Sequence, residues 1–378
     1  MSKTKEKIKY YSLSKILEYD ADYNIVFGER SNGKTYSVLE LAIKNYCESG
    51  KQLAIIRRFR EDFIGKRGNE LFTPLEANNA VYQFSNGEWT HVYYYASRWF
   101  LCRYDESESG NINRIVDDKP FAYAFALGSW EHDKGTGYPD VTIILFDEFI
   151  TRGAYLADEF VLFMNTLSTI IRLRDDVKIF MLANTVNKYC PYFKEMGLKH
   201  ISQMEQGTID LYTIDSEKAR NGQLKIAVEY CDTYNRNAKP SNKYFAFDNA
   251  KLRMITRGAW EIDIYPHCPH KYKPKDVIFT YFIEFDNSLL QCEIVSINNT
   301  LFTFIHEKTT PLKNENEDII YSPRYDSRPN WRRKLTKPVL DIEKRIARFF
   351  IEDKIFYQDN EVGEIVRNYL IWCGKDVK

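Results

Sequence analysis

The stretch FGERSNGKTYS (residues 27–37) carries two glycines separated by four residues, and the second is followed by Lys34 and Thr35. It comes directly after the short apolar segment 23–26 and before a segment with helical periodicity. A glycine-rich loop between a strand and a helix lets backbone N–H groups surround a phosphate. Lys34 would reach the β- and γ-phosphates, and the hydroxyl of Thr35 would bind Mg²⁺. The sequence therefore predicts a nucleotide-binding loop here.

Apolar, strand-like segments alternate with helical ones over about the first 230 residues. Residues 52–59, 141–150 and 178–185 are apolar runs that end in polar side chains, and residues 155–174 have helical spacing. This order predicts an α/β fold with a mostly parallel sheet. Between these elements, residues 81–95 alternate and contain Asn86-Gly87, which predicts a β-hairpin with its turn at that dipeptide.

Two acidic residues end the apolar run IILFDE. Asp147 is expected to hold Mg²⁺, usually through water, and Glu148 to polarise the attacking water molecule. The alternative is a pair of solvated acids at a strand end. Downstream of a phosphate loop, the pair predicts hydrolysis, and it favours a motor-type ATPase over a small GTPase.

Polar residues also end two neighbouring elements. Asn184 follows a buried strand and would either sense the γ-phosphate or simply cap the strand. Arg172 and Arg174 follow the predicted helix, where an arginine can act on a neighbouring subunit's γ-phosphate or lie solvated at the helix end. The residues alone leave both alternatives open.

Three arginines, Arg57, Arg58 and Arg60, lie at the end of the strand 52–59. Guanidinium groups at such a place suit phosphate contact, either with a nucleotide or with a DNA backbone. The alternative is a ladder of surface charges.

The pattern changes in the second half of the chain. We predict a first domain over residues 1–228, a polar linker over 229–262, and a smaller α+β domain over 263–378 that ends in a helical stretch. The basic stretch 324–337, which includes Trp331, could contact nucleic acid or form a charged turn. His267, Cys268 and His270 lack a second ligand pair, so loop residues are favoured over a metal site.

The bulk composition narrows the class of protein. The 53 basic and 53 acidic residues cancel, so a grip on nucleic acid would come from local patches. The seven cysteines form no CxxC pair, which indicates a reducing, cytosolic compartment. No apolar run approaches the length of a membrane span, so no membrane partner is expected.

Taken together, these motifs resemble the DNA-packaging motor ATPases of phi29-like bacteriophages, which are related to the large-terminase ATPases. The resemblance covers about the first 200 residues and is carried by FGERSNGKTYS, IIRRFR, FDEFI, TIIRLR and ANTVNKYCPYF. It implies an ASCE-type P-loop ATPase domain. It also implies a degenerate, RNase H-like C-terminal domain that binds nucleic acid without cutting it.

The resemblance implies roles for single residues. Arg172 matches an arginine finger that acts in trans, and Arg60 matches a second trans-acting basic residue that is Lys in the family prototype. Asn184 matches the asparagine at the third strand tip, and Arg30 matches an arginine inside the loop. The expected nucleotide contacts are then Gly28, Arg30, Ser31, Asn32, Gly33, Lys34 and Thr35.

The resemblance also implies cofactors and partners. They are ATP, Mg²⁺, double-stranded DNA, and four further copies of the chain in a homopentameric ring on the portal, or connector, of an empty procapsid. The protein would act in the host cytoplasm, transiently at the procapsid vertex, and would be absent from the mature virion. The sequence does not settle whether a packaging RNA takes part.

Other classes of protein remain alternatives. These are a terminase-type motor with an active nuclease, a helicase-like nucleic-acid ATPase, and an ATP-gated assembly adaptor that is not an enzyme. Glu284 and Asp286 end a predicted strand where a related nuclease would place a metal-binding acid, but companions are lacking. We therefore expect no nuclease activity.

Overall fold

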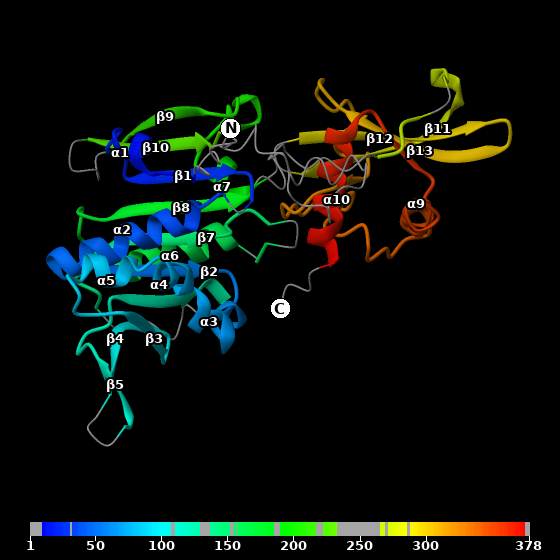
Figure 1. Ribbon diagram of the computed structural model, residues 1–378. Helices are drawn as coiled ribbons and strands as arrows, with labels where there is room; N and C mark the ends of the chain where they lie inside the picture. The colour runs from blue at the N-terminus through cyan, green and yellow to red at the C-terminus, as the bar shows by residue number, and fades with distance from the viewer. Residues whose placement is uncertain are drawn as a thin grey trace, which may run out of the picture. The chain divides into compact units, whose positions relative to one another are not determined.

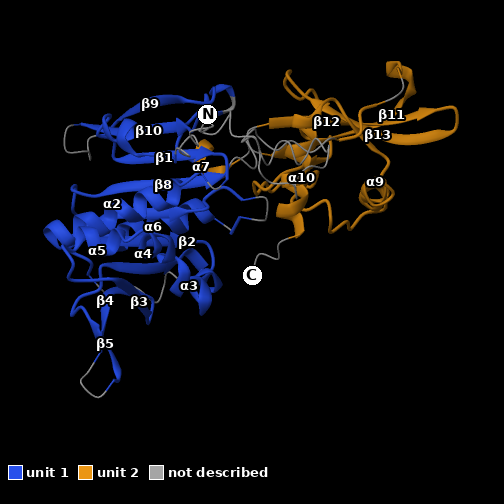
Figure 2. Cartoon of the chain, in the orientation of Figure 1, with its two compact units in different colours: residues 1–188, 195–260 blue, residues 189–194, 261–378 orange. Residues whose placement is uncertain are grey.

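The computed structural model describes residues 10–30, 32–106, 110–128, 137–151, 155–156, 158–184, 190–216, 222–232, 265–268, 271–285 and 288–374. The chain divides into two compact units, each with its own sheet (Figure 2). Unit 1 comprises Met1–Lys188 and Glu195–Trp260, and unit 2 comprises Tyr189–Lys194 and Glu261–Lys378. Most of the linker predicted for residues 229–262 lies outside the described residues.

Unit 1 is built on a ten-stranded sheet with the order β3-β4-β6-β2-β7-β8-β1-β10-β9, and β5 pairs with β4 (Figure 1). The central strands run parallel: β6 (Ala122–Ala126), β2 (Gln52–Arg57), β7 (Val141–Asp147), β8 (Lys178–Asn184), β1 (Tyr23–Gly28) and β10 (Gln223–Tyr230). Antiparallel strands flank them: β3 (His91–Tyr95), β4 (Arg98–Glu106), β5 (Ile112–Val116) and β9 (Thr208–Asp215). The predicted α/β fold with a mostly parallel sheet is confirmed.

Helices α2 (Lys34–Ser49) and α6 (Glu159–Ile171) cover opposite faces of this sheet. Val38 of α2 shares a core cluster with Leu145 of β7. The next residue of β7, Phe146, stacks on Phe163 of α6 with ring centroids 5.0 Å apart. Successive residues of a strand point to opposite faces, so β7 is buried on both sides and reads as a continuous apolar run.

Shorter helices complete unit 1 and show one wrong prediction. Residues 86–87 do not form a hairpin turn, because Ala80–Phe84 is helix α5. The hairpin joins β3 to β4 instead, and its turn residues Ala96 and Ser97 have φ of 48° and 61°. Val81 is fully buried in the core that includes α2, and this burial overrides the local strand pattern. The remaining helices of unit 1 are α1 (Ser14–Leu17), α3 (Lys66–Glu70), α4 (Thr73–Ala77) and 3₁₀ turns at Arg60–Phe63 and Ile201–Gln203, whereas α7 (Pro191–Glu195) lies almost entirely in unit 2.

Unit 2 contains a six-stranded mixed sheet with the order β15-β14-β11-β12-β13-β16. Strands β11 (Val277–Phe285), β12 (Ser288–Ile297) and β13 (Thr300–Glu307) form an antiparallel meander. The short strands β14 (Ile320–Tyr321), β15 (Trp331–Arg332) and β16 (Ile355–Tyr357) add in parallel. Helices α9 (Asp341–Ile351) and α10 (Asn360–Gly374) follow, so the predicted final helical stretch is interrupted by β16.

Among the described helices, none is both long enough and apolar enough to cross a membrane.

Candidate functional site

The parallel register brings the ends of four strands to one edge of the sheet. Gly28 of β1 pairs with Asn184 of β8, and Leu182 of β8 pairs with Asp147 of β7. Strands β2 and β7 pair in register, so that their last residues, Arg57 and Asp147, lie side by side. Residues more than a hundred positions apart in the sequence therefore meet where the first loop enters α2.

The loop before α2 folds around the Lys34 ammonium group. Lys34 Nζ donates to the carbonyl oxygens of Glu29 (2.7 Å) and Gly28 (3.5 Å) and to Asn32 Oδ1 (3.1 Å). Gly33 precedes the helix with a φ of 97°, a left-handed conformation that glycine adopts without strain. Burial lowers the pKa of Lys34, although the nearby acids oppose this effect. Arg30 is exposed, and Ser31 lies outside the described residues.

The N-terminal segment holds this loop in place through contacts that no local pattern in the sequence predicts. Tyr11 N donates to Asn32 O (2.8 Å), and Ser37 Oγ donates to Tyr11 O (2.7 Å). The buried hydroxyl of Tyr11 donates to Glu229 Oε2 on β10 (2.7 Å). Tyr11 thus connects the loop, the first turn of α2 and a strand next to β1.

A cavity of about 650 Å³ opens beside the loop. Its lining includes Tyr10, Lys34, Thr35, Tyr36, Asn78 and Asn184. A volume of this size, with aromatic rings and a few convergent polar groups, suits a small-molecule ligand such as a nucleotide.

The carboxylate of Asp147 joins the loop to β2. Its Oδ1 accepts a hydrogen bond from Thr35 Oγ1 at 3.1 Å, and its Oδ2 accepts one from Arg57 Nη2 at 2.7 Å. The Asp147 side chain is only 8% exposed. A threonine hydroxyl beside a buried carboxylate is the oxygen pair that P-loop proteins use for Mg²⁺. The residues present therefore fit the metal that the sequence predicts.

Glu148 follows Asp147 in a strained backbone conformation. Its φ is 60°, in the left-handed region that costs energy for a residue other than glycine, and its side chain is exposed. Arg58 holds this turn, because Nη1 donates to Glu148 O (3.2 Å) and Nη2 donates to Phe149 O (2.9 Å). Phe149 N also donates to Leu182 O of β8 (3.2 Å).

Arg58 is itself anchored by a buried ion pair. Its Nε and Nη2 donate to the two carboxylate oxygens of Glu159, each at 2.8 Å. Both side chains are buried, and the Arg58 guanidinium lies 5.2 Å from the centroid of the Tyr155 ring. The sequence offered two alternatives for the arginine cluster, phosphate contact and a ladder of surface charges. Both are wrong for Arg58, which is buried and holds the Glu148–Phe149 turn. Arg60 is exposed, at the start of the 3₁₀ turn after β2.

Arg172 lies away from the residues gathered at the loop. It is exposed and caps the C-terminal end of α6. The nearby Arg174 donates to Val141 O, at the start of β7, at 2.6 Å. Val141 and Asp147 are the two ends of β7, about 20 Å apart at 3.3 Å per residue. Arg172 therefore lies at the opposite edge of the sheet and does not face the Asp147 site of its own chain.

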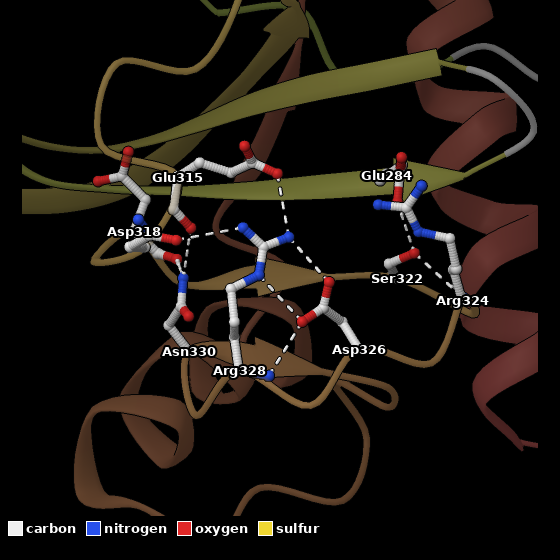
Figure 3. A network of polar contacts seen from close by, with 9 residues as sticks. Glu284, Glu315, Asp318, Ser322, Arg324, Asp326, Arg328 and Asn330 are labelled. Atoms are coloured by element: carbon white, nitrogen blue, oxygen red, sulfur yellow. Dashed lines mark hydrogen bonds and ion pairs between the residues drawn. The ribbon is translucent and has the colours of Figure 1, made fainter.

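Part of the basic stretch 324–337 forms ion pairs with acidic residues of unit 2 (Figure 3). Arg328 pairs with Asp326 (2.8 Å) and Glu315 (3.0 Å), and Arg332 pairs with the buried Glu343. The exposed Arg324 instead lies over the Trp331 ring, 4.9 Å from its centroid, and the exposed Arg333 lies 5.6 Å from that of Trp372.

Glu284 near the end of β11 faces a serine. Ser322 Oγ donates to Glu284 Oε2 at 2.7 Å and accepts from Arg324 N at 3.1 Å (Figure 3). Asp286 and His270 lie outside the described residues. In the part of the chain that the structure describes, no group of three or more His, Cys, Asp or Glu side chains could hold a metal ion.

The fold and the site define a P-loop domain in which one strand, β8, separates the loop strand β1 from β7, the strand that carries the acidic pair.

Residues 109–212 match the family model described as podovirus DNA encapsidation protein (Gp16). The chain is similar to the DNA packaging protein of Bacillus phage B103, with 28% identity over 228 residues that cover 57% of this chain and 63% of that protein. It is also similar to the DNA packaging protein of Bacillus phage phi29, with 26% identity over 60% of this chain and 64% of that protein.

The matched region thus spans just under two thirds of these relatives. The resemblance expected from the motifs is confirmed. Two solved structures share the fold over nearly the whole chain. One is described as the Phi-28 gp11 DNA packaging motor, with a TM-score of 0.56 at 18% identity over 98% of this chain and 100% of that one. The other is the bacteriophage Phi-29 viral genome packaging motor assembly, with a TM-score of 0.54 at 18% identity over 96% and 99%.

The ion pair that supports Glu148 yields a stability prediction. Arg58→Met leaves the Glu159 carboxylate buried without its partner, and we expect the free energy of unfolding to fall by about 3–5 kcal/mol. Arg58→Met combined with Glu159→Leu removes the orphaned charge and should recover most of the loss. Urea unfolding of the full chain, followed by circular dichroism, measures both.

The exposed pair Lys66–Glu70 serves as the control. Lys66→Ala should change the free energy of unfolding by less than about 1 kcal/mol. An equally small effect for Arg58→Met would show that the buried pair does not support the turn.

Proposed function

We propose that the chain is the ATPase of a viral DNA-packaging motor, which hydrolyses ATP to move double-stranded DNA into a preformed procapsid. The observation that carries the proposal is the meeting of the phosphate loop with the Asp147–Glu148 pair at one sheet edge. Similarity to phage DNA packaging proteins supplies the substrate and the setting. An adaptor that only binds ATP would not need the exposed Glu148 next to Asp147, the carboxylate that we propose for Mg²⁺.

Each residue of the site then has a role. Backbone N–H groups at the start of α2 bind the phosphates, and Lys34 exchanges the carbonyls of Glu29 and Gly28 for phosphate oxygens. Thr35 and Asp147 would hold Mg²⁺, which neutralises charge on the phosphates when bound. Glu148 accepts a proton from the attacking water.

Asn184 reads the state of the nucleotide. It lies level with Gly28 in the adjacent strand and lines the same cavity. Its amide can hydrogen-bond to a terminal phosphate or to the water beside it. The loop contacts Gly28, Arg30, Ser31, Asn32 and Gly33 are part of the same proposal.

The catalytic arginine comes from a neighbouring copy. Arg172 is exposed at the sheet edge opposite its own loop, so in a ring of identical chains it can face the next subunit's site. Arg60 is exposed too, and we propose the same trans role for it. The ring is proposed as a pentamer on the procapsid portal, active in the host cytoplasm and not retained in the virion. A packaging RNA is compatible with this arrangement and is not required by it.

Unit 2 is proposed to contact nucleic acid without cutting it. Its sheet combines an antiparallel meander with two parallel additions, β14 beside β11 and β15 beside β14, which supports the RNase H-like prediction. Glu284 is hydrogen-bonded to Ser322, whereas a two-metal nuclease would need several convergent carboxylates. The exposed Arg324 and Arg333 are the groups we propose for phosphate contact.

Substitution of Glu148 tests the hydrolytic role. Glu148→Gln should still bind ATP but should lower the DNA-stimulated ATPase rate by about 10²–10⁴-fold, because the base is lost while the loop remains. Lys34→Ala should lose nucleotide binding as well. Glu70→Gln, an exposed acid on α3, is the control and should keep the wild-type rate. Equal ATPase rates with and without DNA would contradict the packaging role, and a wild-type rate for Glu148→Gln would contradict the assignment of the base.

Mixed rings test the trans role of Arg172. Arg172→Ala alone should bind ATP and lose roughly 10³-fold or more in turnover, and Lys34→Ala alone should be inactive. A mixture should regain part of the activity, since a Lys34→Ala subunit offers its intact Arg172 to a neighbour with an intact loop. Normal turnover by Arg172→Ala alone would remove the finger assignment.

A further inference from the structure

Arg57 forms an ion pair with Asp147, the carboxylate that we propose for Mg²⁺. It is the last residue of β2, and its Nη2 lies 2.7 Å from Asp147 Oδ2. The other oxygen of the same carboxylate accepts from Thr35. The guanidinium is thus the counter-ion of the carboxylate that we propose for Mg²⁺.

The Arg57 side chain is not fully satisfied there. Its Nε–H is buried and has no hydrogen-bond partner. The side chain is 19% exposed, so it reaches the open edge of the sheet although most of it is covered. Guanidinium groups bind phosphate through two parallel N–H donors. Asp147 accepts a hydrogen bond from only one Arg57 nitrogen, Nη2.

Neighbouring arginines do not share this arrangement. The Arg58 guanidinium donates hydrogen bonds to the Glu159 carboxylate and to the carbonyl oxygens of Glu148 and Phe149, and the side chain is buried. Arg60 is exposed on the 3₁₀ turn. Of these three arginines, only Arg57 combines contact with Asp147 and a donor, Nε–H, that has no hydrogen-bond partner.

We propose that Arg57 is a cis-acting phosphate sensor that exchanges Asp147 for the terminal phosphate of a bound nucleoside triphosphate. With a diphosphate bound, the guanidinium stays on Asp147 and opposes the divalent cation there by charge repulsion. With a triphosphate bound, it turns to the terminal phosphate and leaves Asp147 to the cation. The inference rests on the proposed nucleotide site and adds a residue that distinguishes ATP from ADP.

Binding measurements on the full chain test this exchange. Fluorescent ADP and a non-hydrolysable ATP analogue are titrated into wild type, Arg57→Gln and the control Arg67→Gln, which removes an exposed, ion-paired arginine. Mn²⁺ binding in the presence of ADP is followed by electron paramagnetic resonance. We expect Arg57→Gln to weaken the ATP analogue roughly tenfold or more, because a charge-assisted contact is lost, and to tighten Mn²⁺ with ADP several-fold.

The two expected changes have opposite signs, which a purely structural role would not produce. If Arg57→Gln weakens both ligands equally, or changes neither, Arg57 is only a structural partner of Asp147 and the inference is wrong. If Arg57→Gln does not fold, Arg57→Lys keeps the charge without the fork and should show both changes at smaller size. Failure of wild type to bind either nucleotide would instead overturn the proposed function, and with it this inference.

Discussion

The hydrogen bonds that converge on the Asp147 carboxylate are the contacts on which the rest of the site depends. They join Thr35 at the start of α2 to Arg57 at the end of β2 through the last residue of β7. This is possible because the parallel strands end within two residues of one another in the sheet register, which also sets Gly28 beside Asn184. A shift of one strand by one residue would turn Asp147 to the other face of the sheet.

The residues that support Glu148, the proposed catalytic base, are separate from Glu148 itself. Arg58 and Glu159 are buried and paired with each other, and Arg58 also donates to the carbonyl oxygen of Glu148, whose φ is positive. Strain of this kind is retained where the surrounding structure overdetermines it. Arg172 lies at the opposite end of the same sheet, so the trans role that we propose for it requires identical chains to associate head to tail.

The sequence was sufficient for the parts of the fold that depend on local pattern. The phosphate loop, the buried strands and α6 follow from glycine spacing, continuous apolar runs and helical periodicity. The hairpin predicted at residues 86–87 is wrong, because burial of Val81 favours a helix over Ala80–Phe84. Arg58 was grouped with phosphate-binding arginines because its partner, Glu159, lies 101 positions away. The Tyr11 hydroxyl contacts Glu229, 218 positions away, and this contact leaves no local signal either.

A packaging assay tests the central claim most directly. Purified procapsids, linear double-stranded DNA, ATP and the full chain are combined, and DNA that survives nuclease treatment is measured. We predict full-length protected DNA with wild type and ATP, and none when Glu148→Gln replaces wild type. A wild-type protein that hydrolyses ATP in response to DNA, yet protects no DNA in the presence of competent procapsids, would contradict the packaging role.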